Sequence, residues 1–305
     1  MYFPYFRGRQ YELLALKELA QKKIVSNKVI PIIEPIKFSS TFNGTLKEYC
    51  DNGRQIALVL NPQVGDIESE EAPKNICSFI NGTVIPAILM NEDSSEGLRE
   101  MTSKKLDKPI IILKNQDYIE EYRNFLINID PQYTLFPDER QIRRAVQKDK
   151  VLFEDRFIRR EKNAEYLKSE DEFYSDDHLY YKEEGYVGFG DYSIIGDYYD
   201  EGGFAPRAVA IHIVYYDENN ALRIHHFVSD SNYGIEDVAG KFYEAVKKLE
   251  KFFERKEAKQ ETVALKTLIE YANTGYYPGL PTIKKLSIMH HLALISKYLD
   301  GGLDK

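Results

Sequence analysis

Four side chains in this sequence are of the types that together bind a divalent cation: Glu34, Asp155, Asp191 and His212. Three carboxylates and one imidazole offer mostly oxygen ligands, which suit Mg²⁺ or Mn²⁺ better than structural zinc, since structural zinc favours thiolates. A cation of this kind polarises a phosphoryl oxygen and generates a hydroxide nucleophile. The set therefore predicts divalent-metal-assisted hydrolysis of a phosphate ester, with a nucleotide or nucleic acid as substrate.

Three residues are the predicted catalytic groups: Glu34 and Asp191 as acid–base groups or metal ligands, and Lys114 as a phosphate contact. Glu34 interrupts the apolar run IIEPI, where a charge is costly unless it is paired, metal-bound or neutralised. A functional acid is one interpretation. A structural ion pair with Arg7, Arg9 or Lys114 is the other.

Asp191 opens an acidic, glycine-rich loop, DYSIIGDYYDEGGF, directly after the sequence GFG. Glycines permit close backbone approach, and in α/β barrels the loops after the seventh and eighth strands often bind phosphate through backbone N–H groups. A solvated acidic loop is the alternative. Further ligand-binding candidates share a place at a predicted strand end, in this loop or on a returning strand: Asn61, Asn115, Arg156, Tyr192 and His226.

Two of the metal-ligand candidates have competing interpretations. Asp155 follows Glu154, so on a strand the two carboxylates point to opposite faces and only one of them enters a shared site. His212 alternates with Ile211 and Ile213, a pattern also typical of a hydrogen-bonded core histidine. His225 and His226 likewise point to opposite faces of their strand, so one of them is expected to approach the site.

The elements that must position these side chains are short apolar runs separated by helical patterns. The runs are rich in Val, Ile and Leu on both faces, which favours parallel strands covered on both sides. Eight such runs predict a (β/α)8 TIM-barrel-like fold, with a doubly wound open sheet as the alternative. Active sites of such folds lie at the carboxyl ends of the strands. The eight predicted strands span residues 29–36, 55–62, 83–91, 108–115, 133–138, 150–157, 186–195 and 208–216.

The second half of the chain departs from this alternation. A charged, tyrosine-rich insertion is expected at 158–185. The sequence YYDENNALRIHHFVSD predicts a β-hairpin, and three amphipathic segments then predict a helical tail. We therefore expect a barrel-like domain over 1–235, with the hairpin as its extension, and a packed helical extension over 236–305.

Several segments resemble a bacterial and phage group known as "beta family" proteins. They are YFPYFRGRQYELLALKEL, VIPIIEPIK, GFGDYSIIGDYYDEGGF, AVAIHIVYYDENNALRIHHFVSDSN and KKLSIMHHLALI, and together they span nearly the whole chain. The resemblance implies a barrel-like α/β fold and a role in phage defence. It carries over no catalytic residues.

Composition restricts the partners. The 305-residue chain carries a net charge of −8, which gives no strong electrostatic signature for nucleic-acid binding. Two cysteines without a C-x-x-C motif, and no signal peptide or long apolar run, predict a cytoplasmic protein off the membrane. Its 23 tyrosines, clustered at 166–199 and interleaved with acids, favour either an interface with a protein partner or a second copy, or a metal-dependent pocket. A non-catalytic recognition module of a defence system, using the insertion and the tail, is thus the alternative function.

Overall fold

The computed structural model describes residues 1–67, 71–200, 202, 206–254 and 260–302. These residues form two compact units that interleave along the chain. The first unit contains 1–155 and 177–192, and the second contains 156–176 and 193–305. This division differs from the one expected at residue 235, because the segment 156–176 leaves the first unit and the hairpin belongs to the second.

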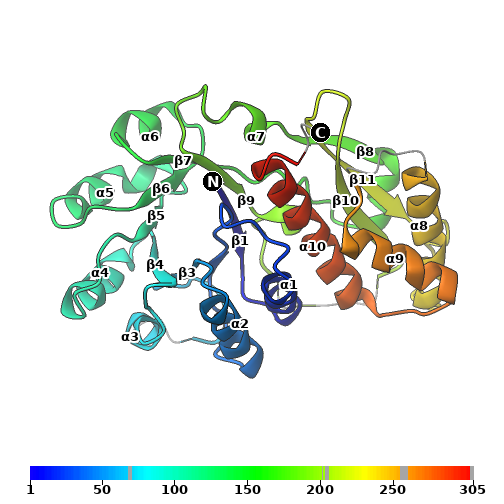
Figure 1. Cartoon of the computed structure of the whole chain (residues 1–305), viewed down its shortest axis with the longest axis horizontal. Helices are drawn as coiled ribbons and strands as arrows, with labels where there is room; N and C mark the ends of the chain where they lie inside the picture. Colours follow the sequence, from blue (N-terminus) through cyan, green and yellow to red (C-terminus); the bar gives the residue numbers. More distant parts are fainter. Residues whose placement is uncertain (68–70, 201, 203–205, 255–259, 303–305) are drawn as a thin grey trace. The chain divides into compact units, whose positions relative to one another are not determined.

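The first unit is a closed barrel of eight parallel strands, which confirms the predicted (β/α)8 TIM-barrel-like class (Figure 1). Helices follow most of the strands and lie outside the barrel. The strands, in barrel order, are β1 (Tyr2–Phe6), β2 (Ile32–Ile33), β3 (Ile56–Val59), β4 (Val84–Leu89), β5 (Ile110–Ile112), β6 (Tyr133–Phe136), β7 (Lys150–Phe153) and β9 (Gly188–Asp191). The helices are α1 (Gln10–Gln21), α2 (Ser40–Asp51), α3 (Ala72–Cys77), α4 (Ser94–Ser103), α5 (Ile119–Phe125), α6 (Arg140–Ala145) and α7 (Asp177–Tyr180).

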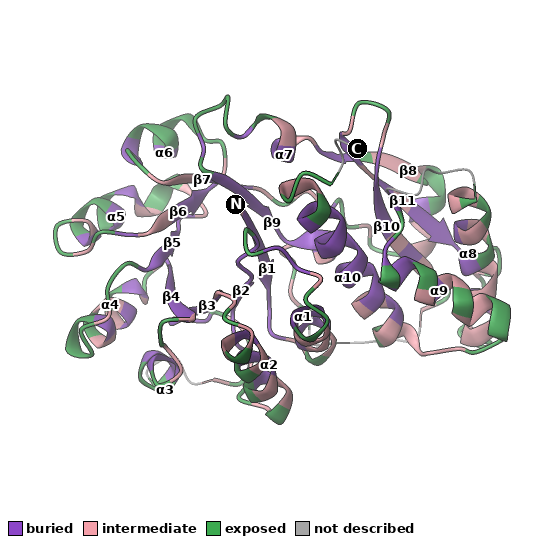
Figure 2. Ribbon diagram, in the orientation of Figure 1, coloured by how far each residue is buried: buried purple, intermediate pink, exposed green. Residues whose placement is uncertain are grey.

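The barrel interior is filled by alternate side chains of the strands. On β1, Phe3 and Tyr5 belong to the interior cluster, whereas Tyr2 and Phe6 are buried outside that cluster, against the surrounding layer. The strands are buried along nearly their whole length (Figure 2). Double-sided burial explains why these strands have continuous apolar runs instead of alternation.

Two strand predictions were wrong. The first barrel strand is β1, which pairs with β2 and β9. It was missed because YFPYF is short, aromatic and interrupted by Pro4, and so lacks the aliphatic pattern of the other strands. The predicted eighth strand, 208–216, lies in the second unit as β10 (Ala210–Tyr216), where it pairs with antiparallel β11 (Leu222–Val228).

The second unit is built on a three-stranded antiparallel sheet in the order β10-β11-β8. The β10–β11 hairpin confirms the predicted turn: Asp217 accepts the backbone N–H groups of Asn219 and Ala221 at 2.8 and 3.0 Å. Its third strand, β8 (Asp171–Ser175), comes from the predicted insertion, after the 3₁₀ helix η2 (Asn163–Lys168). Charged residues hid this strand, because its first half is only partly buried.

Three helices complete the second unit: α8 (Val238–Phe253), α9 (Val263–Thr274) and α10 (Leu280–Leu299). They confirm the predicted helical tail. Helix α10 packs on β10 and α9, and α8 packs on β11. Thr262 caps α9 by accepting the Leu265 N–H at 3.2 Å. Within the described residues, no helix is long and apolar enough to cross a membrane.

Candidate functional sites

Glu34 lies at the carboxyl end of β2, at the mouth of the barrel, and is completely buried. Its carboxylate accepts three donors: the Tyr5 hydroxyl at 2.6 Å, the Gln63 backbone N–H at 2.6 Å and the Arg7 guanidinium. Arg7 is one of the three ion-pair partners that the sequence offered. Burial, followed by the charge of Glu34, raises the pKa of Tyr5 well above its ordinary value, so this hydroxyl stays a donor.

Two cations lie over two tyrosine rings at the same mouth. The Arg7 guanidinium is 5.1 and 5.7 Å from the ring centres of Tyr5 and Tyr192. The Lys114 ammonium is 5.6 and 5.2 Å from the same two rings. Each distance is within cation–π range. The barrel therefore brings together three of the predicted residues, Glu34, Lys114 and Tyr192.

Asp191 is placed differently. Its carboxylate accepts the hydroxyl of Tyr2 at 2.7 Å, and Tyr2 is not part of the interior cluster that contains its neighbour Phe3. Because strand residues alternate, Asp191 and Tyr192 point to opposite faces, so Asp191 does not join Glu34. The preceding Gly190 serves strand packing: a Cβ there would lie 2.4 Å from the Phe3 carbonyl oxygen. Residues 201, 203 and 204 of the predicted phosphate loop lie outside the described residues.

The remaining barrel candidates have structural contacts or lie at the surface. Asn61 links β3 to β4, donating to the Leu89 carbonyl at 2.7 Å and accepting the Leu89 N–H at 3.1 Å. Asn115 caps a 3₁₀ turn by accepting the Asp117 N–H at 2.9 Å. Asp155 is exposed, while Arg156 belongs to the second unit.

The predicted metal ligands do not form one described cluster. Glu34, Asp155 and Asp191 belong to the first unit and His212 to the second. Among the described residues, no group of three or more His, Cys, Asp or Glu side chains is placed to hold a metal ion. The Mg²⁺ or Mn²⁺ site that their types suggested therefore stays a prediction.

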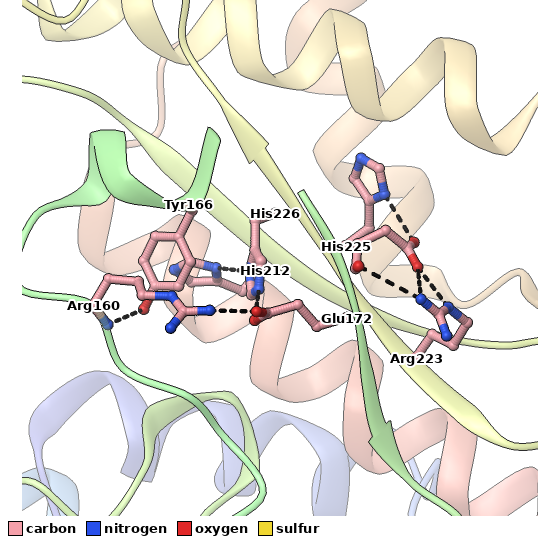
Figure 3. A network of polar contacts seen from close by, with 8 residues as sticks. Arg160, Tyr166, Glu172, His212, Arg223, His225 and His226 are labelled. Carbon is pink, nitrogen blue, oxygen red and sulfur yellow. Dashed lines mark hydrogen bonds and ion pairs between the residues drawn. The ribbon is translucent and has the colours of Figure 1, made fainter. Parts of the chain in front are cut away.

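The second unit contains a chain of polar contacts that ends at His212 (Figure 3). The Glu172 carboxylate lies 3.2 Å from His226 Nε2, and His226 Nδ1 lies 2.7 Å from His212 Nδ1. Arg160 forms an ion pair with Glu172 from the other side. We call Glu172, His226 and His212 the relay. The hairpin register creates it, because His212 and His226 are directly opposite each other on β10 and β11.

Aromatic rings enclose the two histidines. The Tyr166 ring centre is 4.7 Å from that of His212 and 4.4 Å from that of His226, and the Phe157 ring packs on His212 at 5.2 Å. The Tyr166 hydroxyl accepts the Arg160 backbone N–H at 3.1 Å. These contacts fix the orientation of both imidazoles.

Proton positions in the relay follow from the carboxylate. A carboxylate only accepts, so His226 Nε2 carries the proton and His226 Nδ1 is the acceptor. His212 must then donate through its own Nδ1, which leaves His212 Nε2 with a lone pair. Burial, and next the proximity of His226, lowers the pKa of His212 well below its ordinary value. Burial also lowers the pKa of His226, although Glu172 opposes that shift. Both rings are therefore neutral at pH 7.

His212 lines a cavity of about 310 Å³. Three cations, Arg159, Arg160 and Lys284, line the same cavity, together with a single carboxylate, Glu161. In a chain with a net charge of −8, this lining is locally positive. A neutral imidazole base in a cationic cavity is suited to an anionic substrate that must lose or gain a proton.

Sequence reasoning identified His212 and His226 but missed Glu172, Tyr166 and Arg160. His212 and His226 are each seven residues from Asn219, the centre of the hairpin turn, a signal that identifies a cross-strand pair once the hairpin is accepted. Glu172 had no such signal, because its strand lies in the charged insertion. No protein-family model matches this chain, and no curated protein shows significant similarity to it.

Proposed function

We propose that the protein cleaves a phosphate ester by acid–base catalysis in the cavity of the second unit. The observation that carries this proposal is the relay, which runs from Glu172 through His226 to His212 and ends at a lone pair in a cationic cavity. The relay resembles the carboxylate–imidazole arrangement that orients a general base in hydrolases, extended by one imidazole.

Each residue has a role. His212 Nε2 accepts a proton from the attacking water as the water oxygen bonds to phosphorus. The same proton is then available to the leaving oxygen as its bond to phosphorus breaks. Glu172 and His226 hold the tautomer and stabilise the cationic ring that forms on His212. Arg159 and Lys284 balance the charge of the phosphoryl oxygens.

The substrate that we propose is a nucleotide or nucleic acid, and the setting implied by the family resemblance is phage defence in the cytoplasm. Assistance by Mg²⁺ or Mn²⁺ remains a separate prediction. Because the described carboxylates do not gather into a three-ligand site, no step of the proposed reaction is assigned to an ion.

The test is a hydrolysis assay in EDTA with bis(4-nitrophenyl) phosphate, 5′-nucleotides and a short RNA. His212→Asn is the decisive variant, since the Asn amide still donates to His226 at the Nδ1 position but offers no base at the Nε2 position. We expect its kcat to fall about 100-fold or more on a substrate that the parent cleaves. The ¹⁵N shifts of the parent should show His212 with its proton on Nδ1.

Two results would overturn the proposal: no cleavage of any of these esters by the parent, or cleavage that His212→Asn leaves intact. The alternative function, a recognition module docking on a protein partner or on a second copy, predicts that His212→Asn retains binding. It further predicts that replacing the exposed residues of the 158–185 segment abolishes binding. The two functions thus differ in the change that removes activity: His212→Asn for hydrolysis, and replacement of the exposed 158–185 residues for binding.

A further inference from the structure

The opposite face of the same sheet carries a second histidine–carboxylate pair (Figure 3). His225 Nδ1 lies 3.1 Å from the Asp171 carboxylate, which also accepts the Tyr215 hydroxyl at 2.6 Å and the Arg223 guanidinium at 2.5 Å. Burial alone would raise the pKa of Asp171, but these donors outweigh it and lower the pKa to about 2. Asp171 is therefore a carboxylate, and His225 donates to it through Nδ1. His225 Nε2 does not take part in this contact.

An aromatic wall surrounds the His225 ring. Its centre is 4.3 Å from that of Phe227 and 4.5 Å from that of Phe252, at interplanar angles of 35° and 36°. Phe227 is buried, whereas His225 and Phe252 are partly exposed. All three rings line a cavity of about 530 Å³, which has the size of a small-molecule site. The partly exposed rings offer a surface on which a planar group can stack.

The charges around this cavity favour an anion. Lys248 and Lys251 of α8 line it, against one carboxylate, Glu170. Lys248 also donates to the Val228 carbonyl and to Asp230, both at 2.7 Å, which fixes its position at the rim. Lys251 is exposed at the same rim. The lining thus combines stacking rings, an imidazole nitrogen and a net positive charge.

We infer that this cavity binds a nucleotide. It is separate from the relay cavity, although His226 of the relay also lines it, and the inference does not rest on the proposed hydrolysis. The base stacks on Phe252, the usual mode for bases on aromatic rings. His225 Nε2 accepts an N–H of the base. The phosphate lies at Lys251, with Lys248 beside it. The site requires both halves of the ligand, a planar ring and an anion.

The experiment is isothermal titration of the full chain with AMP, adenosine and ribose 5-phosphate. We expect AMP to bind more tightly than either fragment. Phe252→Leu keeps an apolar side chain without the ring and should weaken AMP binding about tenfold, while leaving ribose 5-phosphate unchanged. Lys251→Gln should weaken both AMP and ribose 5-phosphate about threefold. Lys247→Gln is the matched control, because Lys247 is exposed on α8 and does not line the cavity.

Three outcomes would overturn the inference. They are no heat of binding with millimolar AMP, AMP affinity that Phe252→Leu leaves unchanged, and an equal loss of AMP affinity in Lys251→Gln and Lys247→Gln. AMP binding that His212→Asn abolishes and Phe252→Leu preserves would place the nucleotide in the relay cavity. That result would overturn this inference while supporting the proposed function. Conversely, loss of AMP binding in Phe252→Leu, with phosphodiesterase activity intact, supports this nucleotide site without bearing on the proposed hydrolysis.

Discussion

The barrel mouth and the relay cavity use the same kinds of side chain in opposite ways. At the mouth, the carboxylate of Glu34 is enclosed by Tyr5, Arg7 and the Gln63 N–H, and it has no exposed surface. In the relay, the carboxylate of Glu172 orients His226, which orients His212, and the relay ends at His212, which lines a cavity. One carboxylate is held by its donors, whereas the other sets the proton positions of two rings.

The difference shows why the role of an acidic residue inside an apolar run, catalytic or structural, cannot be decided from the sequence. A buried charge must be compensated, and at Glu34 the fold supplies that compensation from two separate segments of the chain, one with Tyr5 and Arg7 and one with Gln63. The compensation also occupies the oxygen atoms that a metal or a substrate would need. Functional potential therefore depends on which atoms remain after the local hydrogen bonds are made, and residue type alone does not reveal this.

The largest effect that tests this comparison is expected at the barrel mouth. Glu34→Ala leaves the Arg7 guanidinium buried without its carboxylate, so we expect the free energy of unfolding to fall by about 3–5 kcal/mol. Urea unfolding measures this loss. Glu120→Ala, which breaks an exposed ion pair with Arg123, is the control and should cost less than about 1 kcal/mol. Equal losses in the two variants would show that Glu34 is not a structural anchor.

Acid should destabilise the second unit. His290 of α10 is fully buried, accepting the Thr262 hydroxyl and donating to the Val214 carbonyl, both at 2.8 Å. Burial lowers its pKa from 6.5 to about 4. Between these values the unfolded chain binds the proton and the folded chain does not, so stability falls as the pH drops from about 6.5 to 4. The loss reaches about 3 kcal/mol, at about 1.4 kcal/mol per pKa unit.

Hydrogen exchange followed from pH 7 to pH 4.5 measures this effect for each unit separately. The lowered pKa values of His212 and His226 act in the same direction, and both residues belong to the second unit. We expect amide protection to fall in β10, β11 and α10 before it falls in the barrel strands. If amide protection fell in both units at the same pH, the acid-sensitive groups would not be confined to the second unit.

The barrel was predictable because the same sequence pattern, an apolar run followed by a helical segment, is repeated along the chain. Seven of its strands carry apolar runs that follow from burial on both faces, and most of the helices between them have the expected spacing. The remaining barrel strand, β1, was not predictable in this way. The run predicted in its place, AVAIHIVYY, has the composition of a barrel strand because helices cover its sheet too, and only its pairing with β11 distinguishes it.

The sites were less predictable for a geometric reason. Sequence places Glu34 and Lys114 at strand ends, and closure of the barrel brings them together around Tyr5 and Tyr192. The same reasoning placed Asp191 beside them, but strand alternation turns its side chain towards Tyr2. Glu172 approaches His226 across strands that are far apart in sequence, and no local pattern encodes that contact.

Glu172→Gln in the relay should lower activity and leave folding largely intact, whereas Glu34→Ala should lower stability. The amide removes the charge that stabilises a protonated His212, so we expect kcat to fall about 10- to 100-fold, equivalent to about 1.4–2.8 kcal/mol. Folding should be largely retained, because Glu172 is partly exposed on β8. Glu218→Gln, the same chemical change in the exposed hairpin turn, is the matched control. An unchanged kcat in Glu172→Gln would remove Glu172 from the mechanism.

The smallest expected effect concerns the metal. A cation that binds only the folded state stabilises it by RT ln(1 + [L]/Kd), or about 2.7 kcal/mol at 100 times Kd. Because the donors around Glu34 already occupy its oxygens and Asp191 contacts Tyr2, we expect Mg²⁺ and Mn²⁺ to stabilise the folded state by less than this amount. Metal-stripped protein and Asp191→Asn are titrated side by side. A rise in the parent that Asp191→Asn lacks would restore the metal site predicted from sequence, and the barrel mouth would then share catalysis with the relay.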